Sequence, residues 1–324
     1  MNAIVNTAPG RLEWRVCPMP EPGPGQVRIR TLACGVCATD LAMIAGWKRT
    51  GFPAIPGHEW YGVVDQLGVG VDAALLGRRC VADNVQPDGG EVGFEHPGGY
   101  GAYFLTAAGN VCVLPDDFPI EAGILLEPLA VSVRALRRMP GGVPVAALIF
   151  GDGPMGLLLS GLLMRSGVAD VCMVGGRRCR LNLAQALGVK RTFDYHQAQG
   201  TLADAVRKAF GREFPAVIEA SGSSSAMTAA LSLAAVEGCV LVVGDYGAGQ
   251  ASFFWNTMLH RQWTLVSSNA SAGAWPEAVH QAVNGFPLGR LVTHRFPARQ
   301  FEDAIETARS CRDAVKVMLV WAEA

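Results

Sequence analysis

The chain has 324 residues, which is long enough for two domains with separate hydrophobic cores. Half of its residues are hydrophobic and its formal net charge is −1, a balance that argues against a nucleic-acid-binding protein. No apolar run reaches the roughly 18 residues of a membrane span, and the first residues lack the features of a signal peptide. Its nine cysteines are irregularly spaced, which predicts reduced thiols in a cytoplasmic protein. Together with the lack of a long apolar run, this predicts no membrane partner.

The N-terminal part, residues 1–115, is predicted to be rich in β-structure. Short strands such as residues 26–30 alternate with turns of proline and glycine, of which residues 20–25 are the clearest. Residues 121–139 then show helical spacing of apolar side chains, and a glycine pair follows them. We therefore expect a single helix at this point of the chain.

Strands and helices alternate from residue 145 to about residue 268. The predicted strands are residues 147–150, 171–174, 192–194, 216–220, 239–243 and 264–267. This alternation predicts a parallel sheet with helices on both faces. The end of the chain is again predicted to contain β-structure, with strands at 292–296 and 315–320 and an amphipathic helix at 301–309.

The fold class expected from this pattern is α/β. A β-rich domain would be made from both ends of the chain, residues 1–134 and 269–324. A doubly wound dinucleotide-binding domain, residues 135–268, would be inserted between them.

A glycine-rich turn, Gly-Asp-Gly-Pro-Met-Gly, lies between an apolar strand and an apolar helix. In such a G-x-G-x-x-G turn the glycines allow a tight turn, an approach of the backbone to a pyrophosphate, and a close contact of helix and strand. The N-terminus of the helix offers unpaired N–H groups to the phosphates. The predicted cofactor contacts of this turn are Gly151, Gly153, Pro154, Met155 and Gly156.

The end of the second strand bears on which nicotinamide cofactor is bound. An acidic residue about 20 residues past the turn normally binds the adenosine ribose of NAD. Here the strand ends at Gly175 and Gly176, and Arg177 and Arg178 follow. Glycine leaves room for a 2′-phosphate, and the arginines can pair with its oxygens. The sequence therefore predicts NADP, with NAD as the alternative if the arginines only form a solvated start to the next helix.

Two segments of the first domain carry residues that bind metals. One is Cys-Gly-Val-Cys-Ala-Thr-Asp at residues 34–40, and the other is Gly-His-Glu at residues 57–59. Sulfur, imidazole and carboxylate together suit zinc, and Asp40 can accept a hydrogen bond from the second ring nitrogen of His58. Taken alone, the cysteine pair is more typical of buried thiols or a redox pair, and His58 of a structural histidine. Their occurrence together, ahead of a nucleotide-binding unit, favours a metal site.

The pattern Gly-His-Glu-x2-Gly-x5-Gly-x2-Val from Gly57 to Val71 resembles the zinc signature of the medium-chain alcohol dehydrogenase superfamily. The resemblance extends along the whole chain, through the glycine-rich turn to Lys316-Val317. Glu127-Pro128-Leu129 is most similar to the sorbitol and threonine dehydrogenase branch. The implied fold is a Rossmann-type sheet inserted into a GroES-like catalytic domain.

The resemblance also implies the residues of the active site. Cys37 and His58 would bind one catalytic zinc ion, with the carboxylate of Glu59 or Glu127 near the metal. Thr39 matches the hydroxyl that passes the substrate proton towards solvent, and Cys34 matches a non-ligand position. The residues implied to line the ribose and nicotinamide are Ser221, Gly222, Ser267 and Asn269.

The function implied is that of a zinc-dependent, NAD(P)-dependent alcohol dehydrogenase. Such an enzyme transfers a hydride between a secondary alcohol or polyol, or the matching ketone, and the nicotinamide. The resemblance further implies a homodimer or homotetramer joined through the strand near residues 264–268. The alternatives are a zinc-free reductase of C=C bonds or quinones and a catalytically inactive nucleotide-binding protein.

The sequence departs from the family pattern at one loop, residues 82–97. Family members with two zinc ions carry four closely spaced cysteines there, and this loop has none. We therefore expect no structural zinc, and we interpret Glu95 and His96 as part of a solvated loop rather than as a ligand pair. Near the metal motifs, Trp47, Phe52 and Trp60 are each as typical of core packing as of a pocket wall. Lys48 and Arg49 are more typical of a solvated loop than of a site for a phosphate or carboxylate.

Overall fold

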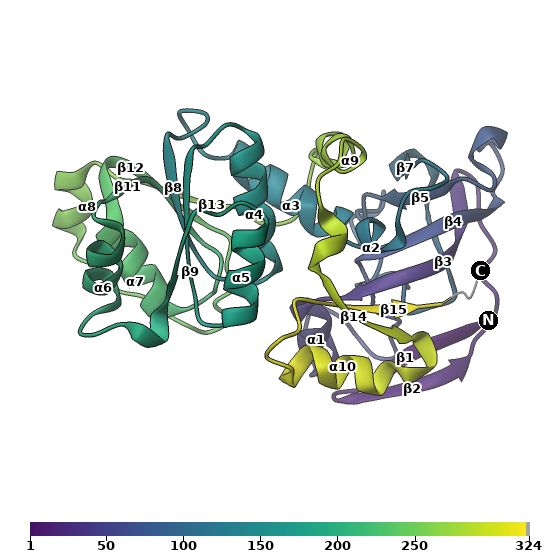
Figure 1. Cartoon of the computed structure of the whole chain (residues 1–324). Coiled ribbons are helices and arrows are strands. Elements are labelled where there is room, and N and C mark those ends of the chain that lie inside the picture. Colours follow the sequence, from purple (N-terminus) through teal and green to yellow (C-terminus); the bar gives the residue numbers. More distant parts are fainter. Residues whose placement is uncertain (322–324) are drawn as a thin grey trace. The chain divides into compact units, whose positions relative to one another are not determined.

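The computed structural model describes residues 1–321 (Figure 1). The chain separates into two compact units. One is Met1–Ala130 together with the segment that begins at Trp275, and the other is Val131–Ala274. Among the described residues, no helix has both the length and the apolar character needed to cross a membrane.

The first unit is built on strands that pair antiparallel, except for one parallel pair, β14 with β15. These are β1 (Asn2–Ala8), β2 (Arg11–Val16), β3 (Gln26–Val36), β4 (Trp60–Leu67), β5 (Arg79–Ala82), β6 (Tyr103–Ala107), β7 (Val111–Val113), β14 (Val292–Pro297) and β15 (Lys316–Val320). Its helices are α1 (Ala38–Ile44), α2 (Ile120–Gly123), α9 (Trp275–Val283) and α10 (Phe301–Ser310). The main sheet has the order β14-β15-β3-β4-β5-β7, with β6 paired to β3, while β1 and β2 form a separate hairpin.

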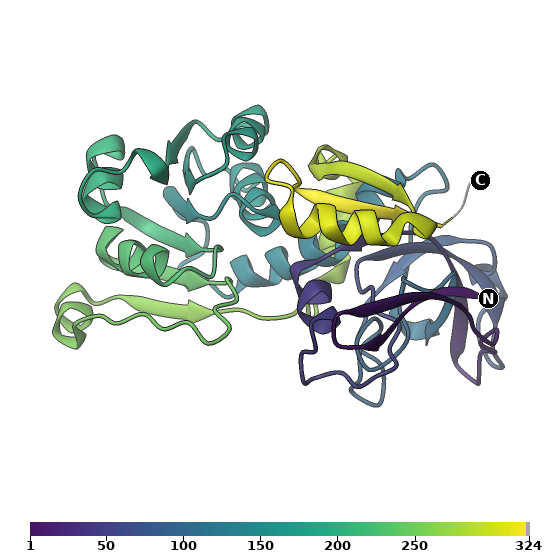
Figure 2. The same ribbon diagram turned by 90° about the horizontal axis from the view of Figure 1, so that it is seen from below.

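Strand β3 positions the metal motifs because it pairs with an N-terminal strand, β4, and with a C-terminal strand, β15. Its alternating sequence buries Val27 and Ile29 in the core, whereas Arg28 faces outwards and pairs with Asp65. One edge of β3 pairs with β4 and the other with β15, so the C-terminal elements lie beside the N-terminal ones (Figure 2). The GroES-like domain is therefore assembled from segments far apart in the sequence.

The second unit contains a six-stranded sheet. Its strands are β8 (Ala146–Phe150), β9 (Asp170–Gly175), β10 (Arg191–Asp194), β11 (Phe214–Glu219), β12 (Ala234–Val242) and β13 (Thr264–Ser267). Its helices are α4 (Pro154–Arg165), α5 (Arg178–Ala186), α6 (Leu202–Phe210), α7 (Ser224–Leu233) and α8 (Trp255–Arg261). All neighbouring strands are parallel in the order β10-β9-β8-β11-β12-β13.

This strand order is that of a doubly wound dinucleotide-binding sheet. The five residues of β8 are all buried, as their continuous apolar sequence predicts. Helices α4 and α5 lie on one side of the sheet and α6 and α7 on the other (Figure 1). The predicted fold class is therefore confirmed.

The prediction of a single helix at residues 121–139 is wrong. The structure has two helices there, α2 and α3 (Leu126–Arg137), separated at Ile124 and Leu125. Pro128 has no N–H to donate to the carbonyl of Ile124, so a continuous helix is disfavoured and a new first turn begins instead. Gly123 ends α2 against the ring of Tyr61, with no space for a side chain.

Candidate metal centre and nucleotide site

Cys37 lies between the end of β3 and the first turn of α1. It is the N-cap residue of that helix, and its N–H donates to Oδ2 of Asp40 at 2.8 Å. The Cys37 thiol also lies 3.6 Å from Oγ1 of Thr39 in the same turn. A cysteine, a hydroxyl and a buried carboxylate are thus gathered by one helix start.

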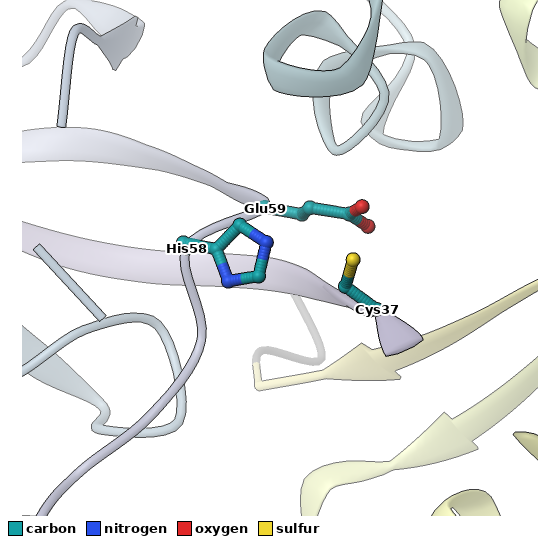
Figure 3. A group of neighbouring side chains, drawn as sticks. All are labelled: Cys37, His58 and Glu59. Carbon is teal, nitrogen blue, oxygen red and sulfur yellow. The ribbon is translucent and has the colours of Figure 1, made fainter. Parts of the chain in front are cut away.

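His58 and Glu59 reach Cys37 because β4 pairs with β3. The N–H of Gly35 donates to the carbonyl of Glu59 at 2.7 Å, and Cys34 lies opposite Trp60. One ligand atom each from Cys37, His58 and Glu59 lies within 4.8 Å of the others (Figure 3). The structure therefore brings together three of the four predicted metal ligands.

The orientation of the His58 ring is set by Asp40. Nδ1 of His58 lies 3.1 Å from Oδ1 of Asp40, as predicted, which leaves Nε2 for a metal. Burial disfavours the charged imidazolium, but the Asp40 carboxylate and the Cys37 sulfur outweigh burial, so the pKa of His58 lies well above its usual value. The surroundings of His58 therefore favour the imidazolium form relative to a free histidine.

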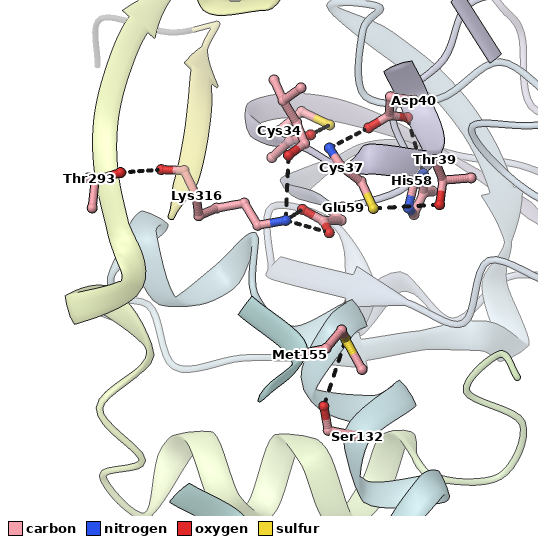
Figure 4. Close-up of polar contacts among 12 residues, drawn as sticks. Cys34, Cys37, Thr39, Asp40, His58, Glu59, Ser132, Met155, Thr293 and Lys316 are labelled. Carbon is pink, nitrogen blue, oxygen red and sulfur yellow. Dashed lines mark hydrogen bonds and ion pairs between the residues drawn. The ribbon is translucent and has the colours of Figure 1, made fainter. Parts of the chain in front are cut away.

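The carboxylate of Glu59 is held by Lys316, a residue whose role sequence reasoning missed. Nζ of Lys316 lies 2.7 Å from Oε1 and 2.6 Å from Oε2 of Glu59, and both side chains are buried (Figure 4). Burial lowers the pKa of Lys316, but the charge of Glu59 outweighs that effect and the net pKa is raised. The available signal was a lysine at the start of an otherwise apolar strand, Lys-Val-Met-Leu-Val.

Glu127 is not part of the group formed by Cys37, His58 and Glu59, but the charges of His58 and Glu59 affect the pKa of its side chain. It is the second residue of α3 and is half-buried. Burial raises the pKa of Glu127 to about 7; His58 and Lys316 lower it and Glu59 raises it further. The side chain of Glu127 has no hydrogen bond or ion pair to another of residues 1–321.

The other candidates near the motifs have structural partners. Cys34 is fully buried, burial raises the pKa of its thiol, and it is not in the metal group. Arg49 pairs with Glu91 and Glu95, and His96 pairs with Asp88, in agreement with a loop rather than a ligand pair or an anion site.

Trp60 is a core residue. Its indole packs against Phe104 at 4.8 Å between ring centroids and donates to Asn84. Trp47 and Phe52, by contrast, are partly exposed. Core packing is therefore the correct interpretation for Trp60.

The glycine-rich turn has the close contacts expected of a dinucleotide-binding unit. Gly151 has a φ of +113°, and a side chain there would meet the backbone of Ala220 at 2.8 Å. A side chain at Gly156 would collide with the carbonyl oxygen of Gly151. Gly153 is the N-cap of α4, Pro154 begins that helix, and the space beside Gly153 is open as far as Arg180, 3.9 Å away.

Asp152, inside the turn, is a second residue whose role sequence reasoning missed. Its Oδ2 accepts hydrogen bonds from the N–H groups of Gly176 at 2.9 Å and Arg177 at 2.8 Å. A side chain at Gly175 would lie 2.6 Å from the Asp152 carboxylate. The end of β9 therefore carries a carboxylate supplied from the turn, and the side chains of Arg177 and Arg178 are exposed beside it.

Glu219 organises two loops at the ends of β11 and β12. Its buried carboxylate accepts from the N–H and hydroxyl groups of Ser221, from the N–H of Gly222 at 3.2 Å, and from the hydroxyl of Tyr246 at 2.5 Å. Ser267 is the last residue of β13, and Asn269 follows it. The four predicted ribose and nicotinamide contacts thus lie at or just beyond strand ends of one parallel sheet.

Comparisons with known proteins agree with this arrangement. A model of the alcohol dehydrogenase GroES-like domain matches residues 23–116, and a zinc-binding dehydrogenase model matches residues 154–284. The chain is 30% identical over 323 residues to D-altritol 5-dehydrogenase of Agrobacterium fabrum, covering 92% of this chain and 93% of the relative. It is 27% identical over 347 residues to L-threonine 3-dehydrogenase of Ruegeria pomeroyi, covering 99% and 100%.

Solved structures share the fold. 2R,3R-butanediol dehydrogenase of Bacillus subtilis superposes with a TM-score of 0.90 at 22% identity, with 99% of both chains covered. A Sinorhizobium meliloti protein solved with NADP bound gives a TM-score of 0.92 at 22% identity, again with 99% of both chains covered. An Escherichia coli alcohol dehydrogenase solved with NADH gives a TM-score of 0.92 at 22% identity, with 99% of both chains covered.

Proposed function

Since this chain belongs to the zinc-dependent medium-chain dehydrogenase superfamily, we propose that it is an alcohol dehydrogenase that uses one catalytic zinc ion and a nicotinamide cofactor. Its substrate would be a secondary alcohol or polyol, or the matching ketone, as the names of the altritol and butanediol relatives suggest. The β-rich domain expected at residues 1–134 and 269–324 would hold the metal, and the domain expected at residues 135–268 would hold the cofactor.

The observation that carries this proposal is the convergence of Cys37, His58 and Glu59 from two paired strands. Sulfur, imidazole and carboxylate donors are the set that zinc accepts in catalytic sites. Asp40 holds Nδ1 of His58, so that Nε2 is left to face the sulfur of Cys37. The residues present therefore fit the metal that the family name implies.

We assign the direct carboxylate ligand to Glu127, with Glu59 in exchange with it. Both oxygens of Glu59 are engaged by Lys316, whereas Glu127 has no cationic partner within hydrogen-bonding distance among residues 1–321. Burial raises the pKa of Glu127, so its carboxylate is poorly solvated although the residue is half-buried, and an ionised carboxylate without a partner is costly in such surroundings. A cation placed between His58 and Glu127 would remove that cost.

The chain's own residues supply binding, orientation and proton transfer. When bound, zinc stabilises the negative charge that develops on the substrate oxygen, and the nicotinamide accepts or donates the hydride. Thr39 lies in contact with the Cys37 sulfur, so its hydroxyl can accept the alcohol proton and pass it outwards. The N-terminus of α4 and the open backbone at Gly153 would bind the pyrophosphate.

For the cofactor we propose NADP. Gly175 leaves no acidic side chain at the end of β9, and the exposed Arg177 and Arg178 can pair with a 2′-phosphate. One observation favours NAD instead, namely the Asp152 carboxylate beside Gly175, which could accept from the ribose hydroxyls. The shared fold does not decide between them, because one neighbour holds NADP and another NADH.

We further propose a cytoplasmic homodimer or homotetramer. All nine cysteines are free thiols, which suits a reducing compartment. Beside the edge strand β13, Phe254, Trp255 and Leu259 are 84%, 74% and 69% exposed, and Leu265 within the strand is 40% exposed. An apolar edge of this kind is typical of a subunit interface. Light scattering on the purified protein tests the mass of the assembly.

The proposed function is tested by a screen of alcohols and ketones with both nicotinamide cofactors, monitored by cofactor absorbance, on zinc-loaded and zinc-depleted protein. We expect turnover of a secondary alcohol or polyol only with zinc. Turnover of a C=C bond or quinone without zinc would favour the reductase alternative, which the relatives do not support. Cofactor binding without any turnover would favour the inactive nucleotide-binding protein.

A further inference from the structure

The loop that lacks the family's cysteines wraps around the backbone of His58. We call this loop, residues 82–97, the His58 loop. The side chain of Asn84 donates to the carbonyl of His58 at 2.8 Å. Gly93, with a φ of +86°, packs so closely that a side chain there would meet the N–H nitrogen of His58 at 2.6 Å. The loop thus contacts His58 on both sides of its Cα atom.

The same loop also contacts the imidazole ring. The ring of Phe94 lies 4.8 Å from the ring of His58 between centroids, with an angle of 34° between the planes. Phe94 is only 9% exposed. Because Asp40 fixes Nδ1 and Phe94 covers the ring, the plane of the imidazole has little freedom to tilt.

Arg49, which follows α1, forms ion pairs with this loop. Its guanidinium makes two bonds to Glu95, at 2.8 Å and 3.1 Å, and one to Glu91 at 2.7 Å. Its central carbon also lies 4.3 Å from the centre of the Phe94 ring. The loop contains Gly89 and Gly93 with positive φ. Glycine has more backbone freedom than other residues, so the contacts of Arg49 are needed to hold the loop in one conformation.

We propose that Arg49 and Phe94 are positioning residues for His58, because they hold the His58 loop against the imidazole by ion pairs and ring packing. The proposal rests on the proposed function, because it matters for catalysis through the metal that His58 would bind. Residues that orient a ligand without touching the metal typically change metal affinity by about 10–100-fold when removed.

The test uses the full-length protein depleted of metal and titrated with Co²⁺. Two readouts are the affinity for Co²⁺ and its visible absorption spectrum, which reports ligand geometry. Arg49→Ala and Phe94→Leu should weaken binding by about 10–100-fold and alter the spectrum. Phe94→Tyr keeps the ring, so its Co²⁺ affinity should remain close to that of the wild type. Arg49→Lys keeps the charge but not the two-bond geometry, so its Co²⁺ affinity should lie between those of the wild type and Arg49→Ala.

Arg28 provides a matched control in the same unit. It also makes two bonds to a carboxylate, that of Asp65 at 2.7 Å and 2.6 Å, and lies 5.6 Å from the ring of Tyr103. Arg28→Ala should leave Co²⁺ affinity and the spectrum unchanged. Wild-type behaviour of both Arg49→Ala and Phe94→Leu, or an equal effect of Arg28→Ala, would overturn the proposal.

A failure of the proposed function is distinguishable from a failure of this inference. If wild-type protein bound no Co²⁺ through Cys37 and His58, the metal site itself would be wrong. The ring protons of His58 in the metal-free protein would still report on positioning through NMR shifts caused by the Phe94 ring. Arg49→Ala keeps the Phe94 ring, so a shift in that variant but not in Arg28→Ala would support the positioning role, and no shift in Arg49→Ala would overturn it.

Discussion

Lys316 Nζ contacts both carboxylate oxygens of Glu59, at 2.7 Å and 2.6 Å, although the two residues are 257 positions apart in the chain. The contact joins the last strand, β15, to the residue that precedes β4. Since both side chains are buried, neither charge is compensated by water. The pair therefore links the C-terminal segment to the centre of the candidate metal site.

Removing the lysine should be costly in the metal-free protein. Lys316→Met leaves the Glu59 carboxylate buried without a partner, and we expect the free energy of unfolding to fall by about 3–5 kcal/mol. In the double variant Lys316→Met/Glu59→Gln the buried charge is gone, so most of the loss should be recovered. Urea unfolding measures both. Equal stability of the single and double variants would show that the charge of Glu59 is not the cause.

Zinc should reduce the cost of the same substitution. A metal ion near Glu59 would compensate the charge that Lys316→Met leaves unpaired. The difference in stability between wild type and Lys316→Met should therefore be smaller with zinc than without it. An equal difference in both conditions would place Glu59 out of reach of the metal.

Loss of a metal ligand should leave cofactor binding unchanged. Cys37→Ser and His58→Ala should abolish turnover, whereas the affinity for the nicotinamide cofactor should stay close to that of the wild type, because the glycine-rich turn lies in the other unit. Cys34→Ala should be mild by comparison, since Cys34 is not in the metal group. Calorimetry with the cofactor and steady-state kinetics give the two readouts. A more damaging effect of Cys34→Ala would reverse the ligand assignment.

Metal binding should depend on pH. The pKa of His58 is raised by Asp40 and Cys37 despite burial, so the proton that the imidazole must lose to bind zinc is held more tightly than in a free histidine. The pKa of Glu127, raised by burial to about 7, adds a second proton to be released. The apparent zinc affinity should therefore fall as the pH falls, and binding should release protons.

Calorimetry in buffers of different ionisation enthalpy counts these protons. Glu127→Gln cannot release the carboxyl proton, so it should release fewer protons than the wild type at a pH below about 7. An affinity that is constant with pH, or the same proton count in Glu127→Gln, would contradict this account.

Cofactor choice should depend on the residues after β9. A charge-assisted bond is worth roughly 1.5–3 kcal/mol, so Arg177→Ala or Arg178→Ala should reduce the preference for NADP by about tenfold or more, while kinetics with NAD serve as the internal control. Gly175→Asp alone is a poor test, because its side chain would collide with Asp152. Asp152→Asn separates the two hypotheses: it should impair NAD more than NADP if Asp152 binds the ribose. Better use of NAD than NADP by the wild type would contradict the NADP proposal.

Much of the fold could be predicted because it is recorded in local patterns. The run of apolar residues before the glycine-rich turn indicates β8, and the family models and relatives confirm the predicted superfamily. The break between α2 and α3 was missed because apolar spacing continues through it, and only Pro128 marks the new helix. Cofactor preference and oligomeric state stay predictions.

The partners of the site residues could not be predicted in the same way. Lys316 with Glu59, and Arg49 with Glu95, depend on contacts between distant segments that no local pattern records. Asp152 lies within a motif whose pattern leaves its position unspecified. The resemblance to a family indicates which residues carry the chemistry, whereas the side chains that orient them become visible only in three dimensions.

The central claim is a single zinc ion held by Cys37 and His58, and elemental analysis of the purified, metal-replete protein tests it most directly. We predict a ratio of about one zinc per chain, as expected of one catalytic site, and a ratio near zero in Cys37→Ser purified in parallel. A wild-type ratio near zero or near two, or an unchanged ratio in Cys37→Ser, would contradict the account.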